Sequence, residues 1–494
     1  MANKISRIGI IQTSPLAGDF STNLRHIVQG YRECLDHGAE LVVAPGAALC
    51  GLEPGNLVNR TSFLQQTKAA LDTLSHELGD APLILGAYTR TVSDDEYYVG
   101  MLGEGEDEDW WLNDDHSVFL TPYLLEKDSV TELENATTVS ILGTEIFTDT
   151  SDEELLPDEP HDIMVRIPCT PWYAGAAKDD EETRNWEAEM SNSVVICCRP
   201  VGTGSTNVYG GGSAVYTPEH KTILRLPYFE NAARVVNLKR PLQAPAIPDA
   251  VELLSRALER GIRDNVRNNG FTGVCLPLDY SNSALLATLC IEALGSENVC
   301  GISFDKENKL ADKLGIASYT PSFDALAAAG SETLGGNENT QLLERLRTAV
   351  AMTHAESRGL MLCSPLSRRE LMLGEFCIYG KSGGHMAPLG NLYDVDIFML
   401  SERMQEKYDG VFGSLSSPEN GVVNRIIHEL ADRNTPPSTL LNEDSNYMFK
   451  ENDVRLIQRK LLASALKRTQ LPIIIHVDPP SERLFFPVTH RLND

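Results

Sequence analysis

The stretch FTGVCLPLDYSNSALLATLCIEALGSENVCGISF, Phe271 to Phe304, decides the fold of the second half of the chain. Its apolar run Val274 to Leu276, closed by Pro277, predicts a short buried strand, and Asn298 to Phe304 predicts a second one. Between them, apolar residues recur at helical spacing from Leu285 to Leu294. A strand, a helix and a strand form a βαβ unit, whose right-handed crossover requires a parallel sheet.

The loop that leaves the first of these strands is the expected ligand loop, because ligands bind at the carboxyl ends of parallel strands. Its residues are Leu278, Asp279, Tyr280, Ser281, Asn282 and Ser283. Asn282 or Ser283 can accept the free N–H groups of the helix's first turn. A phosphate-binding loop needs glycines so that backbone N–H groups can approach the anion, and this loop has none. Asp279 adds negative charge and Tyr280 adds bulk, so the sequence predicts a nucleotide-binding frame without its phosphate cradle.

Composition places the chain among ordinary globular proteins of two domains or one large domain. It has 494 residues, of which 42% are apolar and 23% charged. The net charge of −28 comes from 70 acidic against 42 basic side chains. Such a charge repels nucleic acids and anionic membranes at long range, so we exclude both as the main partner.

The ten cysteines lie mostly in apolar runs and show no paired metal-binding spacing. We interpret them as reduced thiols in the core, which indicates a reducing compartment. The sequence shows no cationic, apolar leader before Arg7 and no apolar run of membrane-spanning length. We therefore expect a cytoplasmic protein.

The first half of the chain is rich in predicted strands. Arg7 to Gln12 and Leu41 to Ala44 flank a helical apolar stripe that runs from Leu24 to Leu35. Further strands are expected at Leu83–Tyr88, Val139–Ile146, Ile163–Ile167, Val194–Cys198 and Ala214–Tyr216. Residues 100–115 are interpreted as a solvated acidic loop, and the acidic runs near Asp152 and Asp179 as polar separators between strands. Many strands with few helices between them suggest a sandwich-like layer.

A proline-rich segment marks the domain boundary. Lys239 to Pro248 contains three prolines, beginning at Pro241. We therefore predict a first domain of residues 1–238, a linker of residues 239–249 and a second domain of residues 250–494. In the second domain we expect helices at Val251–Val266 and Leu342–Thr353 and a strand at Leu360–Cys363.

Motifs in both halves resemble those of the glutamine-dependent NAD⁺ synthetases. In the first half the similar motifs are Arg7-Ile8-x-Ile10-x-Gln12, Gly18-Asp19 with Asn23, Gly38-Ala39-Glu40-Leu41-Val42-Val43 and Pro45. In the second they are Ala293-Leu294-Gly295, Arg345-Leu346-Arg347, Tyr379-Gly380, Ala387-Pro388-Leu389-Gly390 with Leu392-Tyr393, and Lys467-Arg468-x-Gln470-x-Pro472. Their shared order over nearly the whole chain makes the resemblance specific.

The resemblance implies an α/β protein of two domains. The first would be a nitrilase-like α-β-β-α sandwich, an amidase that frees ammonia from glutamine. The second would be a Rossmann-like parallel-sheet domain of the PP-loop class (adenine nucleotide alpha hydrolase-like). It would adenylate deamido-NAD with ATP and magnesium and let ammonia displace AMP.

The amidase residues of the family are absent at the matching positions. The resemblance places the family's glutamate directly after Pro45, where this chain has Gly46, and its lysine near Ser117 or His116. The family's cysteine nucleophile matches Phe147. A benzyl group cannot attack an amide, and a thiolate needs both a nucleophile and a base. Cys169 is a weak candidate for a relocated thiol, because most free cysteines are inert packing residues.

The synthetase residues of the family have changed as thoroughly. The loop Leu278 to Ser283 stands where the resemblance implies a glycine-rich pyrophosphate loop. Residues 365–370 keep only the charge of Arg368 and the carboxylate of Glu370. Lys381 replaces an aspartate, and Asn391 and Asp394 replace an aspartate and a lysine. Two of these changes reverse a charge, which harms magnesium and triphosphate binding more than neutralisation does.

Three hypotheses remain open from the sequence. The first is a pseudoenzyme that keeps the scaffold and acts as a structural or regulatory subunit, paired with itself or with an active paralogue. The second is an enzyme with relocated residues, drawing on His161, Cys169 or His385. The third is a nucleotide or dinucleotide sensor, for which the paired Arg368-Arg369 is the main support, although a surface salt-bridging role is the plainer explanation. We expect no cofactor or metal in this chain, whereas the family uses ATP and magnesium.

Overall fold

The computed structural model describes residues 4–90, 118–336, 339–413, 421–441 and 449–479. The chain divides into two compact units, one of residues 1–204 and 208–248 and the other of residues 205–207 and 249–494. The predicted acidic loop at residues 100–115 lies outside the described residues. No helix among the described ranges is both long and apolar enough to cross a membrane.

Two six-stranded sheets form the first unit. The first sheet has the order β14-β1-β2-β3-β4-β5, with β1 at Arg7–Gln12, β2 at Leu41–Val43, β3 at Leu83–Arg90, β4 at Val118–Glu126, β5 at Ser129–Glu132 and β14 at Ala232–Asn237. The second has the order β13-β12-β9-β8-β7-β6, with β6 at Thr137–Ile141, β7 at Thr144–Asp149, β8 at Ile163–Arg166, β9 at Val194–Cys197, β12 at Ala214–Thr217 and β13 at Lys221–Arg225. A short pair, β10 (Val201–Thr203) and β11 (Val208–Gly210), stands apart from both sheets.

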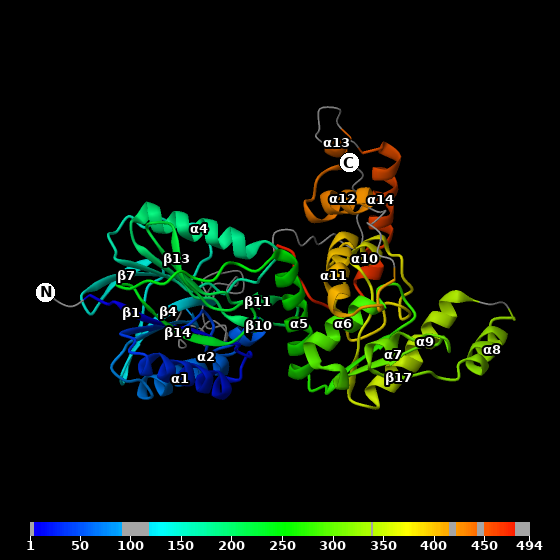
Figure 1. Cartoon of the computed structure of the whole chain (residues 1–494), viewed down its shortest axis with the longest axis horizontal. Coiled ribbons are helices and arrows are strands. Elements are labelled where there is room, and N and C mark those ends of the chain that lie inside the picture. Colours follow the sequence, from blue (N-terminus) through cyan, green and yellow to red (C-terminus); the bar gives the residue numbers. More distant parts are fainter. Residues whose placement is uncertain (1–3, 91–117, 337–338, 414–420, 442–448, 480–494) are drawn as a thin grey trace, which may run out of the picture. The chain divides into compact units, whose positions relative to one another are not determined.

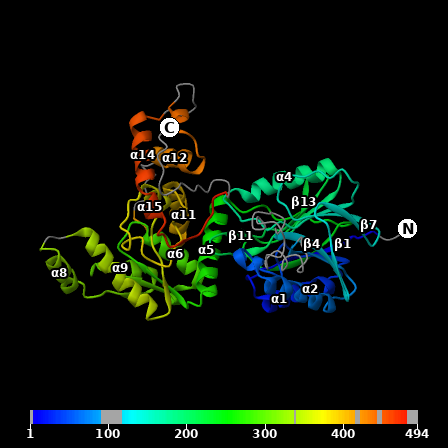
Figure 2. The ribbon, with the colours of Figure 1, turned by 180° about the vertical axis from the view of Figure 1, so that it is seen from behind.

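The alternation of apolar residues along these strands stacks the two sheets face to face. Ile8 and Ile10 of β1 share a buried cluster with Ile146 of β7 and Val165 of β8. Helices α1 (Phe20–Asp36) and α2 (Thr61–His76) cover the outer face of the first sheet. Helix α4 (Ala176–Ser191) covers the outer face of the second, on the opposite side from α1 and α2 (Figures 1 and 2). This is the α-β-β-α sandwich that the resemblance implies.

Two expectations for this unit were wrong. The single strand predicted at Val139–Ile146 is a hairpin, because Leu142 (φ 50°) and Gly143 (φ 74°) form a two-residue turn in the left-handed region between β6 and β7. The acidic run near Asp179 belongs to α4. The apolar part of its buried face consists of alanines (Ala176, Ala177 and Ala188), so the sequence offered no strong apolar stripe.

Helix α4 is attached to the second sheet by buried ion pairs. Arg166, at the end of β8, contacts Asp149 of β7 at 3.2 Å and Glu187 of α4 at 3.7 Å, and all three are almost fully buried. Arg184 of α4 contacts Asp152 at 3.0 Å. Buried charges of one sign must be matched by the other, so these pairs fix how the helix sits on the sheet.

The second unit is built on a parallel sheet with the order β17-β16-β15-β18, comprising β15 (Gly273–Pro277), β16 (Val299–Ile302), β17 (Ala317–Tyr319) and β18 (Leu360–Leu362). Helix α6 (Ser283–Leu294) connects β15 to β16, as predicted, and buries Leu285, Leu286 and Leu289. The strand order reverses beside β15, because the chain moves outward to β16 and β17 and then returns to β18 on the other side. Such a reversal creates a crevice at the carboxyl ends of the strands, where ligands bind in folds of this type.

The remaining elements of the second unit are mostly helices. The helices are α5 (Ala250–Asn268), α7 (Leu310–Leu314), α8 (Asp324–Thr333), α9 (Thr340–Glu356), α10 (Arg368–Leu373), α11 (Asp394–Lys407), α12 (Gly421–Ile427), α13 (Pro437–Leu440), α14 (Glu451–Ala463) and α15 (Ala465–Arg468). A π-helical turn, His428–Asp432, follows α12, and β19 (Met386–Ala387) pairs with β20 (Ile473–Ile474).

The predicted cap of α6 was wrong in its contacts. The Asn282 side chain makes no capping hydrogen bond, and its Nδ2 donates to the carbonyl of Pro365 at 3.2 Å. Ser283 Oγ instead donates to the Pro277 carbonyl at 2.7 Å and accepts the N–H of Tyr280 at 3.2 Å. The side chains of Asn282 and Ser283 therefore hydrogen-bond to backbone groups outside α6 and do not cap the first turn of the helix.

We expect Leu289→Ala to lower the free energy of unfolding of the second unit by about 2–5 kcal/mol, because the cavity cannot collapse in a fully buried site. Urea unfolding followed by hydrogen exchange of the α6 peptides is the measurement, since all four tryptophans lie in residues 1–248 and do not report on this unit. The control is Leu466→Ala, at a side chain that is 60% exposed. Equal effects of the two substitutions would contradict a close-packed α6.

Candidate functional site

Gly46 follows β2 and lies in a space that excludes a side chain. A Cβ atom built on Gly46 would stand 2.5 Å from the carbonyl oxygen of Ile167 and 2.8 Å from Cδ2 of Leu120. Real Cβ contacts are not this short, so a glutamate at this position requires backbone or side-chain movement. The position that would carry the amidase base is therefore both empty of a carboxylate and closed to one.

Phe147 lies on β7 with its side chain buried. It packs with Met164, Val195 and Ala188 on the α4 side of the second sheet, and its ring centroid is 5.7 Å from that of His161. Its neighbour Ile146 points the other way, into the space between the sheets. Phe147 thus serves as a core residue. Ser117 and His116, the predicted lysine positions, lie outside the described residues.

Cys169 lies beside Gly46 but lacks the environment of a nucleophile. Burial raises the pKa of the Cys169 thiol to about 12, and the nearby carboxylate of Glu53 adds to this. Such a thiol stays protonated near neutral pH, whereas the thiolate is the reactive form. The geometry therefore does not favour Cys169 as a relocated nucleophile.

The two histidines proposed for an alternative site are held by structural contacts in separate units. His161 contacts the carbonyl of Glu159 through Nδ1 at 2.9 Å and Ser193 Oγ through Nε2 at 3.1 Å. His385 accepts the N–H of Leu362 through Nδ1 at 2.9 Å and packs edge-on against Phe271. No group of three or more His, Cys, Asp or Glu side chains within the described ranges could hold a metal ion.

Tyr280 fills the crevice where the strand order reverses. Its hydroxyl donates to Glu344 Oε2 of α9 at 2.7 Å, and Lys381 Nζ lies 5.0 Å from its ring centroid. Burial, with the adjacent Glu344, raises the pKa of the Tyr280 phenol, so the hydroxyl remains a donor. The crevice has a volume of about 60 Å³. Its lining residues are Pro277, Asp279, Tyr280, Phe304, Arg347, Thr348, Ala351, Leu362, Gly380, Lys381 and Gly383. Pockets for small ligands measure roughly 300–1,000 Å³, so a nucleotide does not fit here.

Asp279 ties the same loop to the neighbouring strand. Its Oδ2 accepts the N–H of Phe304 at 2.7 Å, and its Oδ1 accepts the hydroxyl of Ser303 and Nδ2 of Asn308, the latter at 3.1 Å. Leu278 is buried, and Ser281 is exposed. The carboxylate thus takes up N–H and O–H donors of the region in which a phosphate would need them.

Arg368 is buried in the second unit and contacts carboxylates on two sides. Its guanidinium contacts Asp432 and also Asp478, the latter at 3.2 Å, and lies 5.4 Å from the ring centroid of Tyr393. Burial lowers the pKa of Arg368, but Tyr393, Asp432 and Asp478 outweigh it and hold the pKa above its usual value. The expectation of a surface pair was wrong for Arg368, which is 9% exposed. This charge is used inside the fold and does not face a ligand.

The two reversed charges meet partners of opposite sign. Asp394 contacts Arg369 Nε at 3.0 Å, and Arg369 also contacts Glu375 at 2.6 Å. Lys381 Nζ is in direct contact with Glu370 Oε1. An ammonium group therefore lies against the carboxylate whose counterpart in the resemblance serves magnesium and ATP chemistry. Asn391, the remaining changed position, accepts the N–H of Val477 at 2.8 Å.

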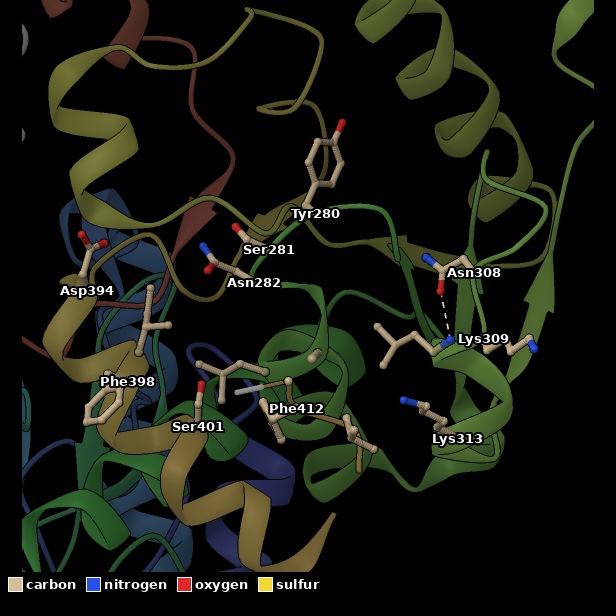
Figure 3. A pocket seen from close by; sticks show the side chains of 16 residues that line it. Tyr280, Ser281, Asn282, Asn308, Lys309, Lys313, Asp394, Phe398, Ser401 and Phe412 are labelled. Carbon is tan, nitrogen blue, oxygen red and sulfur yellow. Dashed lines mark hydrogen bonds between the residues drawn. The ribbon is translucent and has the colours of Figure 1, made fainter. Parts of the chain in front are cut away.

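A larger pocket lies beside the amino end of α6, with a volume of about 590 Å³. Figure 3 shows Lys309 and Lys313 on one side of it, and Asp394 and Phe398 on the other. Lys313 Nζ donates to the carbonyl of Gly410 at 2.7 Å, whereas Lys309 forms no ion pair with any residue that the structure describes. Tyr280, Ser281 and Asn282 of the ligand loop also line this pocket, which, unlike the smaller crevice, has room for a small molecule.

The partners of the changed residues were not found by sequence reasoning. Glu344, Asp432 and Glu375 each neutralise or hydrogen-bond a predicted site residue, yet none lies in a motif. Asp432 lies 64 residues from Arg368 along the chain. The reversed charges Lys381 and Asp394 pair with Glu370 and Arg369 instead, so no pattern in the sequence pointed to these three carboxylates.

Comparison with known proteins extends the resemblance to the whole chain. A profile of the NAD synthase family matches residues 254–411. The glutamine-dependent NAD(+) synthetase of Rhodobacter capsulatus is 26% identical over 437 residues, covering 79% of this chain and 77% of the relative. That of Synechocystis sp. is 23% identical and covers 94% of both chains.

A solved structure agrees in fold. The crystal structure of a glutamine-dependent NAD(+) synthetase from Cytophaga hutchinsonii superposes with a TM-score of 0.80, covering 99% of this chain and 98% of that chain at 13% identity. The nitrilase-like sandwich and the Rossmann-like sheet therefore occur here in the same order as in that protein. On the evidence of these sequences and of the fold, the chain is a homologue of the glutamine-dependent NAD⁺ synthetases.

Proposed function

We propose that this protein is a catalytically inactive member of its family that acts as a structural or regulatory subunit of an oligomer. The observation that carries the proposal is the pairing of the changed residues with one another and with their surroundings: Tyr280 with Glu344, Lys381 with Glu370, and Asp394 with Arg369. Each of these three side chains completes an internal contact. Packed and paired side chains thus leave only about 60 Å³ in the crevice beside β15.

The amidase half supports the same conclusion independently. Gly46 offers no room for a carboxylate, and Phe147 belongs to the packed face beneath α4. A thiol nucleophile and its base act as a unit, so the loss of both leaves no group to attack an amide. The alternative of an enzyme with relocated residues finds no support in Cys169, His161 or His385, which are protonated or held by structural contacts.

An exposed helix supports a role in assembly. No residue of α8 is buried, although the helix is rich in alanine and exposes Leu326, with Leu334 exposed just after it. The ten-residue helix packs against Leu342 and Leu346 of α9 through Gly330, while Leu326 stays exposed. We infer that a second copy of this chain covers α8, and that an active relative is the alternative occupant. All ten cysteines are free thiols, which supports a reducing compartment such as the cytoplasm.

A sensor is the second candidate function, and the pocket beside α6 favours it. The pocket combines Lys309 and Lys313 with the apolar side chains of Phe398 and Phe412. A molecule with one anionic group and one flat apolar part, such as an adenine nucleotide, matches this lining. Arg368 and Arg369 do not support the sensor, because both are paired with carboxylates.

We expect no release of ammonia from glutamine above a protein-free blank at micromolar protein. Phe147→Cys alone should not restore activity, because the base is still missing. Gly46→Glu should lower the free energy of unfolding by about 1–3 kcal/mol, since the side chain overpacks its site. Ammonia release by the unmodified protein, or full activity of Phe147→Cys, would contradict the proposal.

ATP with magnesium should give no thermal shift at about 1 mM, a concentration at which a ligand with a Kd of about 10 µM stabilises by about 2.7 kcal/mol. The physical reason is the Tyr280 side chain in the crevice and the Lys381 ammonium against Glu370. A magnesium-dependent rise in melting temperature with ATP would contradict the proposal that this site is inactive. A shift with adenosine or AMP that needs no magnesium and disappears in Lys309→Glu would favour the sensor instead.

Light scattering at physiological salt should give a mass of at least a dimer. The interface must bury about 1,000 Å² or more and outweigh the repulsion of the −28 charge, which salt confines to about 8 Å. Leu326→Glu should reduce the mass to that of the monomer. Met190→Glu, at a comparably exposed apolar residue of α4, is the matched control and should not. A monomer that also fails to bind an active synthetase would remove the assembly role.

A further inference from the structure

Two cysteines lie side by side in the parallel sheet of the second unit. Cys275 of β15 and Cys300 of β16 are register partners, so their side chains point to the same face. Neighbouring strands are about 4.8 Å apart, which lies within the range of Cα separations that a disulfide spans. The Cys300 thiol donates to the carbonyl of Gly301 at 3.7 Å, and the two cysteines shift each other's pKa in opposite directions. Both are free, and Cys300 keeps 8% exposure whereas Cys275 is fully buried.

A histidine from the helix that covers this face completes the group. His354 of α9 lies near enough to lower the pKa of the Cys300 thiol, and its ring stacks on that of Tyr319 at 4.1 Å between centroids, with 3° between the ring planes. Its Nε2 is buried and has no hydrogen-bond partner among the described residues. The imidazole is thus held in one orientation with a buried nitrogen free to take the thiol proton. Arg358, which follows the end of α9, also lowers the pKa of Cys300.

These contacts favour the thiolate at one sulfur. The neighbouring Cys275 thiol, opposed by burial and supported by His354 and Arg358, lowers the pKa of Cys300 to about 6. The same contacts raise the pKa of Cys275. The pair therefore holds one nucleophilic sulfur and one protonated sulfur, which is the arrangement of an attacking and a resolving thiol.

We propose that Cys275 and Cys300 form a reversible oxidation site, in which a peroxide converts the two thiols into a disulfide between neighbouring parallel strands and His354 acts on the Cys300 proton. The site lies within the strands, outside the ligand loop and both degenerate centres, and does not depend on the proposed function.

The steps balance with one equivalent of hydrogen peroxide. The Cys300 thiolate attacks one peroxide oxygen, the O–O bond breaks, the departing hydroxide takes a proton and leaves as water, and Cys300 becomes a sulfenic acid. The Cys275 sulfur then attacks the Cys300 sulfur, and its proton leaves with the sulfenic hydroxyl as a second water. The sulfurs lose two electrons and peroxide gains two. A small dithiol reverses the reaction by thiol–disulfide exchange.

The other close pair of cysteines in this unit is a built-in control. Cys290 of α6 and Cys363, just after β18, lie near enough for Cys290 to raise the pKa of Cys363, and both are fully buried. Burial and the Cys290 contact raise the pKa of Cys363 well above its usual value, and no histidine is among the causes. Proximity alone would make the two pairs react alike, whereas an activated thiolate makes only the first pair react.

The experiment treats the folded, full-length protein with hydrogen peroxide near neutral pH, blocks the remaining thiols and maps disulfides by peptide mass spectrometry. We expect a Cys275–Cys300 link that dithiothreitol removes, with Cys290 and Cys363 recovered as thiols. Gel filtration and circular dichroism of the oxidised protein must match those of the reduced form. Absence of the link in folded protein, or equal oxidation of the two pairs, overturns the proposal.

Two variants separate the roles of the residues. Cys275→Ser should trap the sulfenic acid on Cys300, seen as a dimedone adduct, because the resolving thiol is gone. His354→Gln should slow the alkylation of Cys300 by iodoacetamide about tenfold near neutral pH and shift its pH profile upward, since less thiolate forms. An unchanged alkylation rate and profile in a folded His354→Gln protein overturns the role of the histidine. Should Cys275→Ser fail to fold, the disulfide map of the unmodified protein still decides the proposal.

Discussion

The buried guanidinium of Arg368 is the constraint on which the C-terminal part of the molecule depends. A charge with 11% of its side chain exposed is costly unless carboxylates surround it, and Asp432 and Asp478 come from two distant segments to do so. Tyr393 completes the group by donating to Asp432 at 2.6 Å. Removing one partner of such a group typically costs about 3–5 kcal/mol, so α10, the π-helical turn and the last strand are fixed together.

The same rule applies to the charged residues at the changed positions. A catalytic site keeps charges and donors that only a ligand completes, whereas here Lys381 faces Glu370 and Asp394 faces Arg369. Unselected drift would leave some of these groups unmatched. In the first unit, the buried charge of Arg166 beneath α4 is likewise paired with the carboxylates of Asp149 and Glu187. These charges are therefore balanced within the fold and need no ligand to pair them.

Chemistry remains where the fold leaves a polar group incomplete. The pocket beside α6 keeps Lys309 without an ion pair among the described residues, and the thiol pair of β15 and β16 keeps a buried imidazole nitrogen. The pocket and the thiol pair lie at different parts of the same sheet. The pocket is suited to ligand binding and the thiol pair to oxidation. Neither needs the catalytic residues that the resemblance implies, so both are compatible with the inactive protein proposed above.

The sequence by itself determined the class of both folds, because apolar periodicity and local motifs are short-range signals. It also located the changed positions Gly46, Phe147, Tyr280 and Lys381. It misplaced the β6–β7 hairpin, where alternation continued through the turn, and α4, whose buried face is mostly alanine and charge. Only the tertiary structure decided what the changed residues do, since Glu344, Glu370 and Asp432 reach them from separate elements. Compensation of a buried charge is set by distance in space, and no pattern along the chain records it.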